Sequence, residues 1–68
     1  MKDAVINRIY EIRMKSDITQ EKLSEKIGVS RQTIIAIEKG NYIPSVLLAL
    51  KLAKFFKKPV EELFYLSQ

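Results

Sequence analysis

The sequence predicts an all-α domain made of five short helices. Three observations lead to this fold class: turn-forming residues divide the chain at regular intervals, the apolar residues between them recur at helical spacing, and residues suited to cap a helix precede several segments. We expect all 68 residues to form one domain, because a chain of this length has room for a single core. The dividing residues are Ser16-Asp17, Gly28, Gly40-Asn41 with Pro44, and Lys57-Lys58-Pro59.

The first segment is predicted to be a helix that begins near Val5. Its apolar residues Val5, Ile9 and Ile12 recur at helical spacing, with Ile6 beside them. Strand alternation does not fit this order of residues. We therefore expect the helix to run up to the turn at Ser16-Asp17.

Two helices joined by a very short connection follow. Thr19 and Ser30 are good N-caps, because a hydroxyl at that position accepts a hydrogen bond from an amide of the first turn. Gly28 and Gly40 end the two helices, since glycine adopts the left-handed conformation without a Cβ penalty. The residues predicted to face inward are Leu23, Ile27, Ile34 and Ile37.

A longer and a shorter helix complete the predicted fold. Ser45 caps the first, roughly Val46 to Phe56, which is the most apolar of the five and which we expect at the centre of the core. Pro59 suits the first position of the last helix. The predicted inward residues are Val46, Ala49, Leu50, Ala53 and Phe56 in the longer helix and Val60, Leu63 and Phe64 in the shorter one.

The composition argues against an enzyme. The chain has no histidine and no cysteine, which removes disulfides, thiolate and imidazole metal sites, and the usual nucleophile and general-base systems. We therefore expect no catalytic residue, no metal and no cofactor. Twelve basic residues against eight acidic ones leave a net charge of +4, which permits a polyanionic partner without identifying one.

No segment predicts a membrane span or an export signal. The longest apolar run, Val46 to Leu50, ends at Lys51, far short of the roughly 20 residues that a membrane helix requires. Near the N-terminus Asp3 and Arg8 interrupt the apolar positions, so a continuous signal-peptide core is missing. We expect a cytoplasmic protein with no membrane partner.

The two helices on either side of Gly28 carry the functional prediction. A tight connection lets the second helix cross the first steeply and project from the surface, where it can enter a DNA major groove. Its first residues, Arg31 and Gln32, are expected to face outward. Arginine can present two donors to guanine, and glutamine can both donate to and accept from adenine, so the pair suits base edges. The alternative is that both side chains are simply solvated in a helical first turn.

The same residues resemble a known family. The runs from Ile18 to Ile34 and from Ile37 to Ser45 closely resemble the Cro/C1-type, or XRE-like, helix-turn-helix family, and the resemblance extends from about Asn7 to Phe64. It implies a five-helix, lambda repressor-like DNA-binding domain with the helix-turn-helix at about 19–39, in which helix 30–39 reads the DNA. The resemblance also implies a sequence-specific transcriptional regulator that binds double-stranded DNA.

Carried over position by position, the resemblance implies two sets of DNA-contacting residues. Gln20 matches a glutamine that reaches a phosphate and can brace Gln32, whereas Glu38 matches an acidic position with an intramolecular role. Ser30 joins the phosphate set because a helix N-terminus attracts anions. Thr33 can instead serve the helix start, and Tyr42 can instead cover the core. The base-contacting set is Arg31, Gln32, Thr33 and Ala36, and the phosphate-contacting set is Gln20, Ser30, Lys39, Asn41 and Tyr42.

Two places depart from the family pattern. Ser24 replaces the small apolar residue, usually alanine, that lets the two helices approach, so its hydroxyl must find an acceptor. Ile35 and Ala36 stand where relatives often carry polar residues. This difference predicts fewer hydrogen-bonded bases and allows a contact with a thymine methyl group.

Apolar residues beyond the needs of one small core predict a homodimer. A two-fold dimer would place two reading helices about 34 Å apart, which matches a pseudo-palindromic operator. Such a small regulator is expected to repress by occupying a promoter, and no small-molecule effector is evident. The alternative is a helical protein-interaction module, such as an antitoxin or accessory regulator, which Ile35, Ala36 and Leu47 favour. The residues expected at the dimer interface are Leu47, Phe55, Tyr65 and Leu66.

Overall fold

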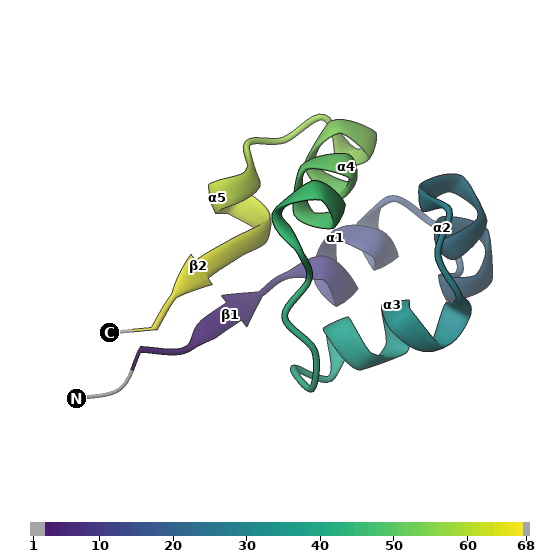
Figure 1. Cartoon of the computed structure of the whole chain (residues 1–68). Helices are drawn as coiled ribbons and strands as arrows, with labels where there is room; N and C mark the ends of the chain where they lie inside the picture. Colours follow the sequence, from purple (N-terminus) through teal and green to yellow (C-terminus); the bar gives the residue numbers. More distant parts are fainter. Residues whose placement is uncertain (1–2, 68) are drawn as a thin grey trace.

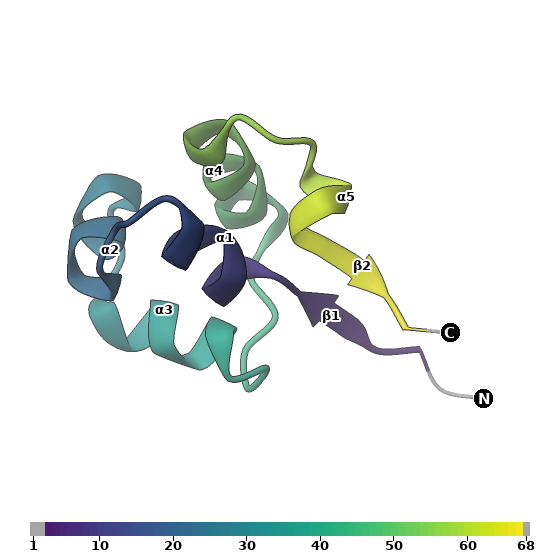
Figure 2. The ribbon, with the colours of Figure 1, turned by 180° about the vertical axis from the view of Figure 1, so that it is seen from behind.

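The computed structural model describes residues 3–67, which fold into five helices and two short strands. The helices form one body, and the two strands extend from it side by side (Figure 1 and Figure 2). The prediction of five helices is confirmed, and the small sheet is an addition to it. In chain order the elements are β1 (Val5–Asn7), α1 (Ile9–Lys15), α2 (Gln20–Ile27), α3 (Arg31–Glu38), α4 (Val46–Phe56), α5 (Val60–Leu63) and β2 (Phe64–Leu66).

Side-chain caps begin α2, α3 and α4 where the sequence predicts them. The hydroxyls of Thr19, Ser30 and Ser45 each accept a hydrogen bond from the backbone amide three residues on, at 3.0 to 3.2 Å. Gly28 ends α2 with a φ of 85°, the left-handed conformation expected of it. Gly40, with a φ of 79°, turns the chain just after α3.

The strands correct the prediction of a helix that begins near Val5. The chain is extended over Val5–Asn7, and α1 begins at Ile9, whose amide donates a hydrogen bond to the Asn7 side chain at 3.1 Å. Valine and isoleucine are β-branched and favour extended backbone where a partner strand is present. That partner lies at the other end of the chain, beyond the reach of local periodicity. The antiparallel register is Val5↔Leu66, Ile6↔Tyr65 and Asn7↔Phe64.

The last helix is shorter than predicted for the same reason. α5 ends at Leu63, and Phe64 belongs to β2 instead of the helix. Pro59 stands immediately before α5 and not at its first position. The amide of Arg8 donates to the Leu63 carbonyl at 2.9 Å, so the sheet pairing continues directly from the end of the helix.

The core draws at least one fully buried side chain from every helix. The inward residues predicted for α2 and α3 are all buried, and so are Ile9 and Ile12 of α1. Asn7 ties β1 to this core, because its amide donates to the Ile37 carbonyl at 2.8 Å. The fully buried side chains are Ile9, Leu23, Ile34, Ile37, Leu52 and Leu63.

The orientation of α4 corrects the predicted inward stripe. Leu48, Leu52 and Ala53 face the core, whereas Val46 is 76% exposed and Leu50 is 53% exposed. Of the predicted stripe only Ala53 is buried, at 7% exposure. The physical reason is that α4 is apolar almost all round, so helical spacing alone does not select the inward face. α4 has 11 residues, and within residues 3–67 no helix is long and apolar enough to cross a membrane.

Candidate nucleic-acid interface

Helices α2 and α3 meet at the connection 28–30 and pack closely on each other. Ile34 and Ile37 anchor α3 in the core, and each is completely buried. α3 lies along one edge of the molecule, with α2 at its N-terminal end (Figure 1). The arrangement leaves the outer side of α3 clear of the other helices, as a groove-reading helix requires.

The start of α3 presents two polar side chains to solvent. Arg31 and Gln32 are exposed, as expected. Thr33 is half-buried, and its hydroxyl lies 3.1 Å from the hydroxyl of Ser30, so it takes part in the helix start. Ala36 is half-buried further along the helix. Of the four predicted base-contacting residues, Arg31 and Gln32 are therefore the most accessible to a ligand.

The loop after α3 carries three of the predicted phosphate-contacting residues. Lys39, Asn41 and Tyr42 are all exposed. The Asn41 amide donates to the Ala36 carbonyl at 2.9 Å, which folds the loop back onto the end of α3. Tyr42 is 45% exposed and lines a hollow of about 260 Å³ with Thr33, Leu47 and others. The loop and α3 thus share one side of the molecule.

Two predicted phosphate contacts remain: Ser30 is exposed at the start of α3, and half-buried Gln20 is bonded to Glu38. The Gln20 Nε2 donates to Glu38 Oε1 at 3.0 Å. The expected brace between Gln20 and Gln32 is therefore replaced by a link to the last residue of α3. A shallow hollow of about 350 Å³ joins Gln20 to Arg31 at the N-terminal ends of α2 and α3.

Arg13 completes this network, and sequence reasoning did not single it out. Its Nε lies 2.6 Å from Glu38 Oε2 and its Nη2 lies 3.2 Å from Glu38 Oε1, so the pair is bidentate. Nη1 also donates to the Ile18 carbonyl at 2.9 Å. The intramolecular role predicted for Glu38 is thus confirmed. An arginine on a short amphipathic helix gives no sequence signal that its partner lies in α3.

Ser24 finds the acceptor that its position requires. The residue is buried, and its hydroxyl donates to the Glu21 carbonyl at 2.6 Å. Because serine is also a small residue, it lets α2 and α3 approach each other closely. Within residues 3–67 no buried side-chain nitrogen or oxygen lacks a hydrogen-bond partner.

The residues predicted for a dimer interface lie on different parts of the surface. Leu47 is 66% exposed near the start of α4, and Leu66 is 59% exposed on β2. Phe55 is half-buried and packs edge to face on Phe56, with ring centroids 5.0 Å apart. Tyr65 is a neighbour of Leu66 on one strand, so the two side chains point to opposite faces of the sheet.

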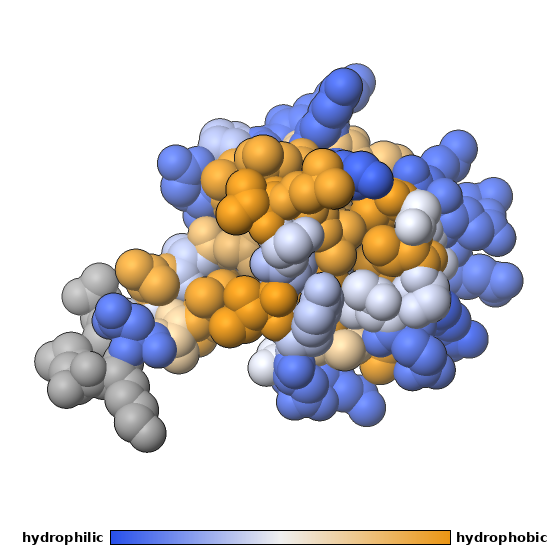
Figure 3. Space-filling view, in the orientation of Figure 1, coloured by the Kyte–Doolittle hydropathy of each residue, from blue (hydrophilic) through white to orange (hydrophobic). Residues whose placement is uncertain are grey.

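Exposed apolar side chains gather on α4 and the loop before it. Ile43, Val46, Leu47 and Leu50 are each more than half exposed, and we call them the α4 patch. In the view of Figure 3 the apolar surface lies over α4 and continues toward the strands. A continuous apolar surface of this kind is typical of an interaction site.

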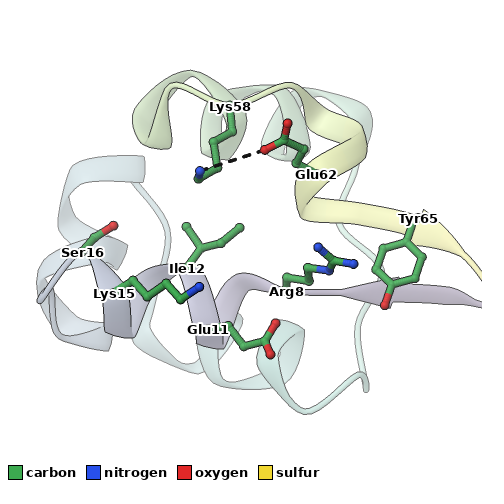
Figure 4. Close-up of a pocket in the computed structure, with 8 residues that line it drawn as sticks. All are labelled: Arg8, Glu11, Ile12, Lys15, Ser16, Lys58, Glu62 and Tyr65. Atoms are coloured by element: carbon green, nitrogen blue, oxygen red, sulfur yellow. Dashed lines mark ion pairs between the residues drawn. The ribbon is translucent and has the colours of Figure 1, made fainter.

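A further groove lies away from the helix-turn-helix and carries charges of both signs. It has a volume of about 650 Å³ and runs between α1 and α5 (Figure 4). Lys58 lies 4.0 Å from Glu62, and the Arg8 guanidinium stacks on the Tyr65 ring at 5.0 Å. The open groove therefore offers paired surface charges, and its lining residues are Arg8, Glu11, Ile12, Lys15, Ser16, Lys58, Glu62 and Tyr65.

Comparison with known proteins decides the family. The model of the helix-turn-helix family matches residues 9–63, which span α1 to α5. This chain belongs to the Cro/C1-type helix-turn-helix family. Helices α2 and α3 are its helix-turn-helix, and the protein is a DNA-binding transcriptional regulator and not an enzyme.

Several other helix-turn-helix regulators are similar to this chain in sequence. It is 50% identical over 62 residues to the uncharacterized HTH-type transcriptional regulator YgzD of Bacillus subtilis, covering 91% of this chain and 94% of the relative. It is 55% identical over 58 residues to an uncharacterized HTH-type transcriptional regulator of Methanocaldococcus jannaschii, covering 85% and 88%. It is also 39% identical to the cryptic phage CTXphi transcriptional repressor RstR of Vibrio cholerae, covering 84% of this chain and 51% of that protein.

A solved structure supports the helix-turn-helix fold. The restriction-modification controller protein C.AhdI of Aeromonas hydrophila superposes with a TM-score of 0.74 at 28% identity. The match covers 79% of this chain and 82% of the controller protein. The lambda repressor-like fold implied by the resemblance is therefore confirmed.

Proposed function

We propose that this regulator is a sequence-specific repressor that reads the major groove of double-stranded DNA with α3. The observation that carries the proposal is the exposure of Arg31 and Gln32 at the start of a helix whose opposite side is fully buried. In this proposal Arg31 and Gln32 bond to base edges, and Thr33 and Ala36 contact bases through a methyl group or the nearby backbone.

Phosphate contacts on either side of α3 fix its position in the groove. Gln20 and Ser30 lie at the N-terminal ends of α2 and α3, where the helix dipoles favour anions. Lys39, Asn41 and Tyr42 lie exposed beyond the other end of α3. The two groups thus bracket α3, an arrangement that suits two phosphate contacts flanking one half-site.

The proposal includes a homodimer on a pseudo-palindromic operator. The α4 patch supports it, because a 68-residue domain without disulfides gains stability and operator length by pairing with itself. Leu47 belongs to this patch, and we retain Phe55, Tyr65 and Leu66 as interface candidates on other parts of the surface. Leu47→Asp should therefore shift the sedimentation coefficient to that of a monomer and weaken operator binding.

Repression is supported by one relative and by the architecture. The Vibrio cholerae relative is a transcriptional repressor, and this chain aligns with it over 57 residues. A single bound domain can act by covering a promoter, which needs no further contact with the transcription machinery. A promoter fusion that stays fully active when the protein is bound to its operator would contradict this role.

Selection of bound sequences from a random duplex pool tests the proposal. We expect the selected sequences to share a motif with two-fold symmetry, and the absence of any shared motif would contradict sequence-specific recognition. Arg31→Ala should cost about 1–3 kcal/mol of binding free energy at one base position and relax the sequence preference there. Lys54→Ala is the matched control, because Lys54 is an exposed cation on α4 outside the proposed contact sets.

A second candidate function rests on the α4 patch. The same exposed residues would serve a protein-interaction module, such as an antitoxin or accessory regulator. Ile35 and Ala36, which favoured this alternative in the sequence, are half-buried within the domain and offer less surface than expected. A protein that retains no duplex DNA at moderate salt but forms a defined complex with a second protein would favour this function.

A further inference from the structure

The buried pair of Arg13 and Glu38 joins α1 to α3 and also holds Gln20, a residue of the proposed DNA-binding surface. Glu38 is the last residue of α3, and its side chain is only 6% exposed. Its Oε1 accepts from Gln20 Nε2 at 3.0 Å and from Arg13 Nη2 at 3.2 Å, while its Oε2 accepts from Arg13 Nε at 2.6 Å. The carboxylate is thus fixed by Arg13 and in turn fixes Gln20.

The chemistry of the contact determines which way the Gln20 amide points. A carboxylate paired with arginine only accepts hydrogen bonds, so the amide must turn its nitrogen, and not its oxygen, toward Glu38. The nitrogen carries two hydrogens, of which this bond uses one. Among residues 3–67 this is the one hydrogen bond of the nitrogen, and Gln20 lines an open hollow with Arg13, Thr19, Glu21 and Arg31.

This orientation matches what a phosphate needs. A phosphate oxygen only accepts, so an unrestrained glutamine would have to select one amide orientation and lose side-chain rotamers when it binds. We infer that Glu38, held by Arg13, is a positioning residue for DNA binding, which fixes the Gln20 amide so that its free N–H meets a backbone phosphate. The inference rests on the proposed function, because it requires the phosphate contact of Gln20.

The test separates this role from simple stabilisation by changing position 38 without leaving a buried charge. In an Arg13→Met background, Glu38→Leu removes the acceptor for Gln20, whereas Glu38→Gln keeps an acceptor oxygen at the same place. Replacing a buried ion pair by uncharged residues of similar volume commonly preserves the fold. Thermal melting followed by circular dichroism confirms that each variant is folded before its affinity is measured.

The readout is a phosphate-by-phosphate scan, in which single neutral methylphosphonates replace the phosphates of the selected duplex. For the parent chain, a methylphosphonate at one particular phosphate should lower the affinity about tenfold. Gln20→Ala should bind the unmodified duplex more weakly by a similar factor, and a methylphosphonate at that phosphate should not weaken its binding further. The double variant that combines Arg13→Met with Glu38→Leu should behave like Gln20→Ala. Glu38→Gln in the same background should recover only part of the affinity and of the response, because its amide can present either its oxygen or its nitrogen to Gln20.

Each result has a defined meaning. If the parent chain binds no duplex, the proposed function fails, and this inference fails with it. If the parent binds specifically but the Glu38→Leu combination keeps its response to the methylphosphonate, only the positioning role is overturned. Should the combinations not fold, NMR of the parent chain decides: the Gln20 side-chain amide must be as ordered as the backbone, in contrast to exposed Gln32, and equal mobility of the two would overturn the inference.

Discussion

The Glu38 carboxylate and the Arg13 guanidinium form a bidentate ion pair in the interior of the domain, with side chains that are 6% and 7% exposed. The pair joins the last residue of α3 to the last turn of α1. Arg13 also lies over the Tyr10 ring, with its guanidinium carbon 5.4 Å from the centroid. Since Ile18 receives a further hydrogen bond from Arg13, this one side chain connects three segments of the chain.

Removing either member of the pair should therefore unfold much of the protein. Arg13→Ala or Glu38→Ala leaves a buried charge without its partner, and we expect a loss of about 3–5 kcal/mol in the free energy of unfolding. A domain of this size has only a few kcal/mol of stability in total, so both variants should be largely unfolded at 37 °C. Urea titration followed by circular dichroism measures the loss.

The control replaces both members at once. Arg13→Met combined with Glu38→Leu removes the two charges together, and the free energy of unfolding should change by less than the loss in either single variant. Equal losses in the single and combined variants would show that the loss comes from the missing attraction within the pair and not from a buried charge without a partner.

The orientation of α4 gives a second prediction, in which two leucines of one helix behave differently. Leu52 is completely buried, and Leu52→Ala should cost about 2–5 kcal/mol because it leaves a cavity in the core. Leu50 is 53% exposed, and Leu50→Ala should cost about 1 kcal/mol or less. Both are measured by urea unfolding at low protein concentration, and a larger loss at Leu50 would mean that α4 is turned the other way.

Local sequence signals predicted the helices that have distinct ends, and missed what depends on distant residues. Thr19 and Ser30 indicated where α2 and α3 begin, because a cap bond joins residues only three positions apart. β1 was missed because its partner strand is formed by the last residues of the chain. α4 was located correctly but turned the wrong way, since leucines on both sides of the helix satisfy the same spacing.

The exposure of the proposed DNA-binding surface was predictable to a similar degree. Exposure of Arg31 and Gln32 followed from the buried spacing of Ile34 and Ile37 on the same helix. The partner of Gln20 did not follow, because a glutamine can bond to any donor or acceptor that the tertiary structure brings near. The structure brings Glu38 to it, and family resemblance had indicated only that Glu38 acts within the molecule.

Ser24 gives a third prediction that concerns the contact between α2 and α3. Ser24→Ala should change the free energy of unfolding by no more than about 0.5 kcal/mol, because the gain in helix propensity offsets one lost hydrogen bond. The Glu21 carbonyl keeps the helical bond from the amide four residues on, so no acceptor is orphaned. The free energy is obtained from urea titration.

Ser24→Val is the matched variant at this position. Its extra methyl groups enter a buried site between the two helices, and overpacking of this kind costs about 1–3 kcal/mol. If valine were tolerated as well as alanine, close approach at Ser24 would not be what the helix-turn-helix requires.

Backbone conformation at the helix ends gives the last prediction, which compares a glycine and a lysine in the same region of φ. Gly28 has a φ of 85° and a Cβ placed there would meet nothing within 4 Å, so Gly28→Ala should lose about 1 kcal/mol through backbone strain alone. Lys57 ends α4 with a φ of 58°, and Lys57→Gly should gain about 0.5–1 kcal/mol by relieving the same strain. Lys54→Gly is the control inside α4 and should lose about 1 kcal/mol. Each 1 kcal/mol corresponds to roughly 4–8 °C in Tm, so thermal melting resolves the changes in all three variants. A lower Tm for Lys57→Gly than for the parent chain would show that the left-handed lysine is not strained.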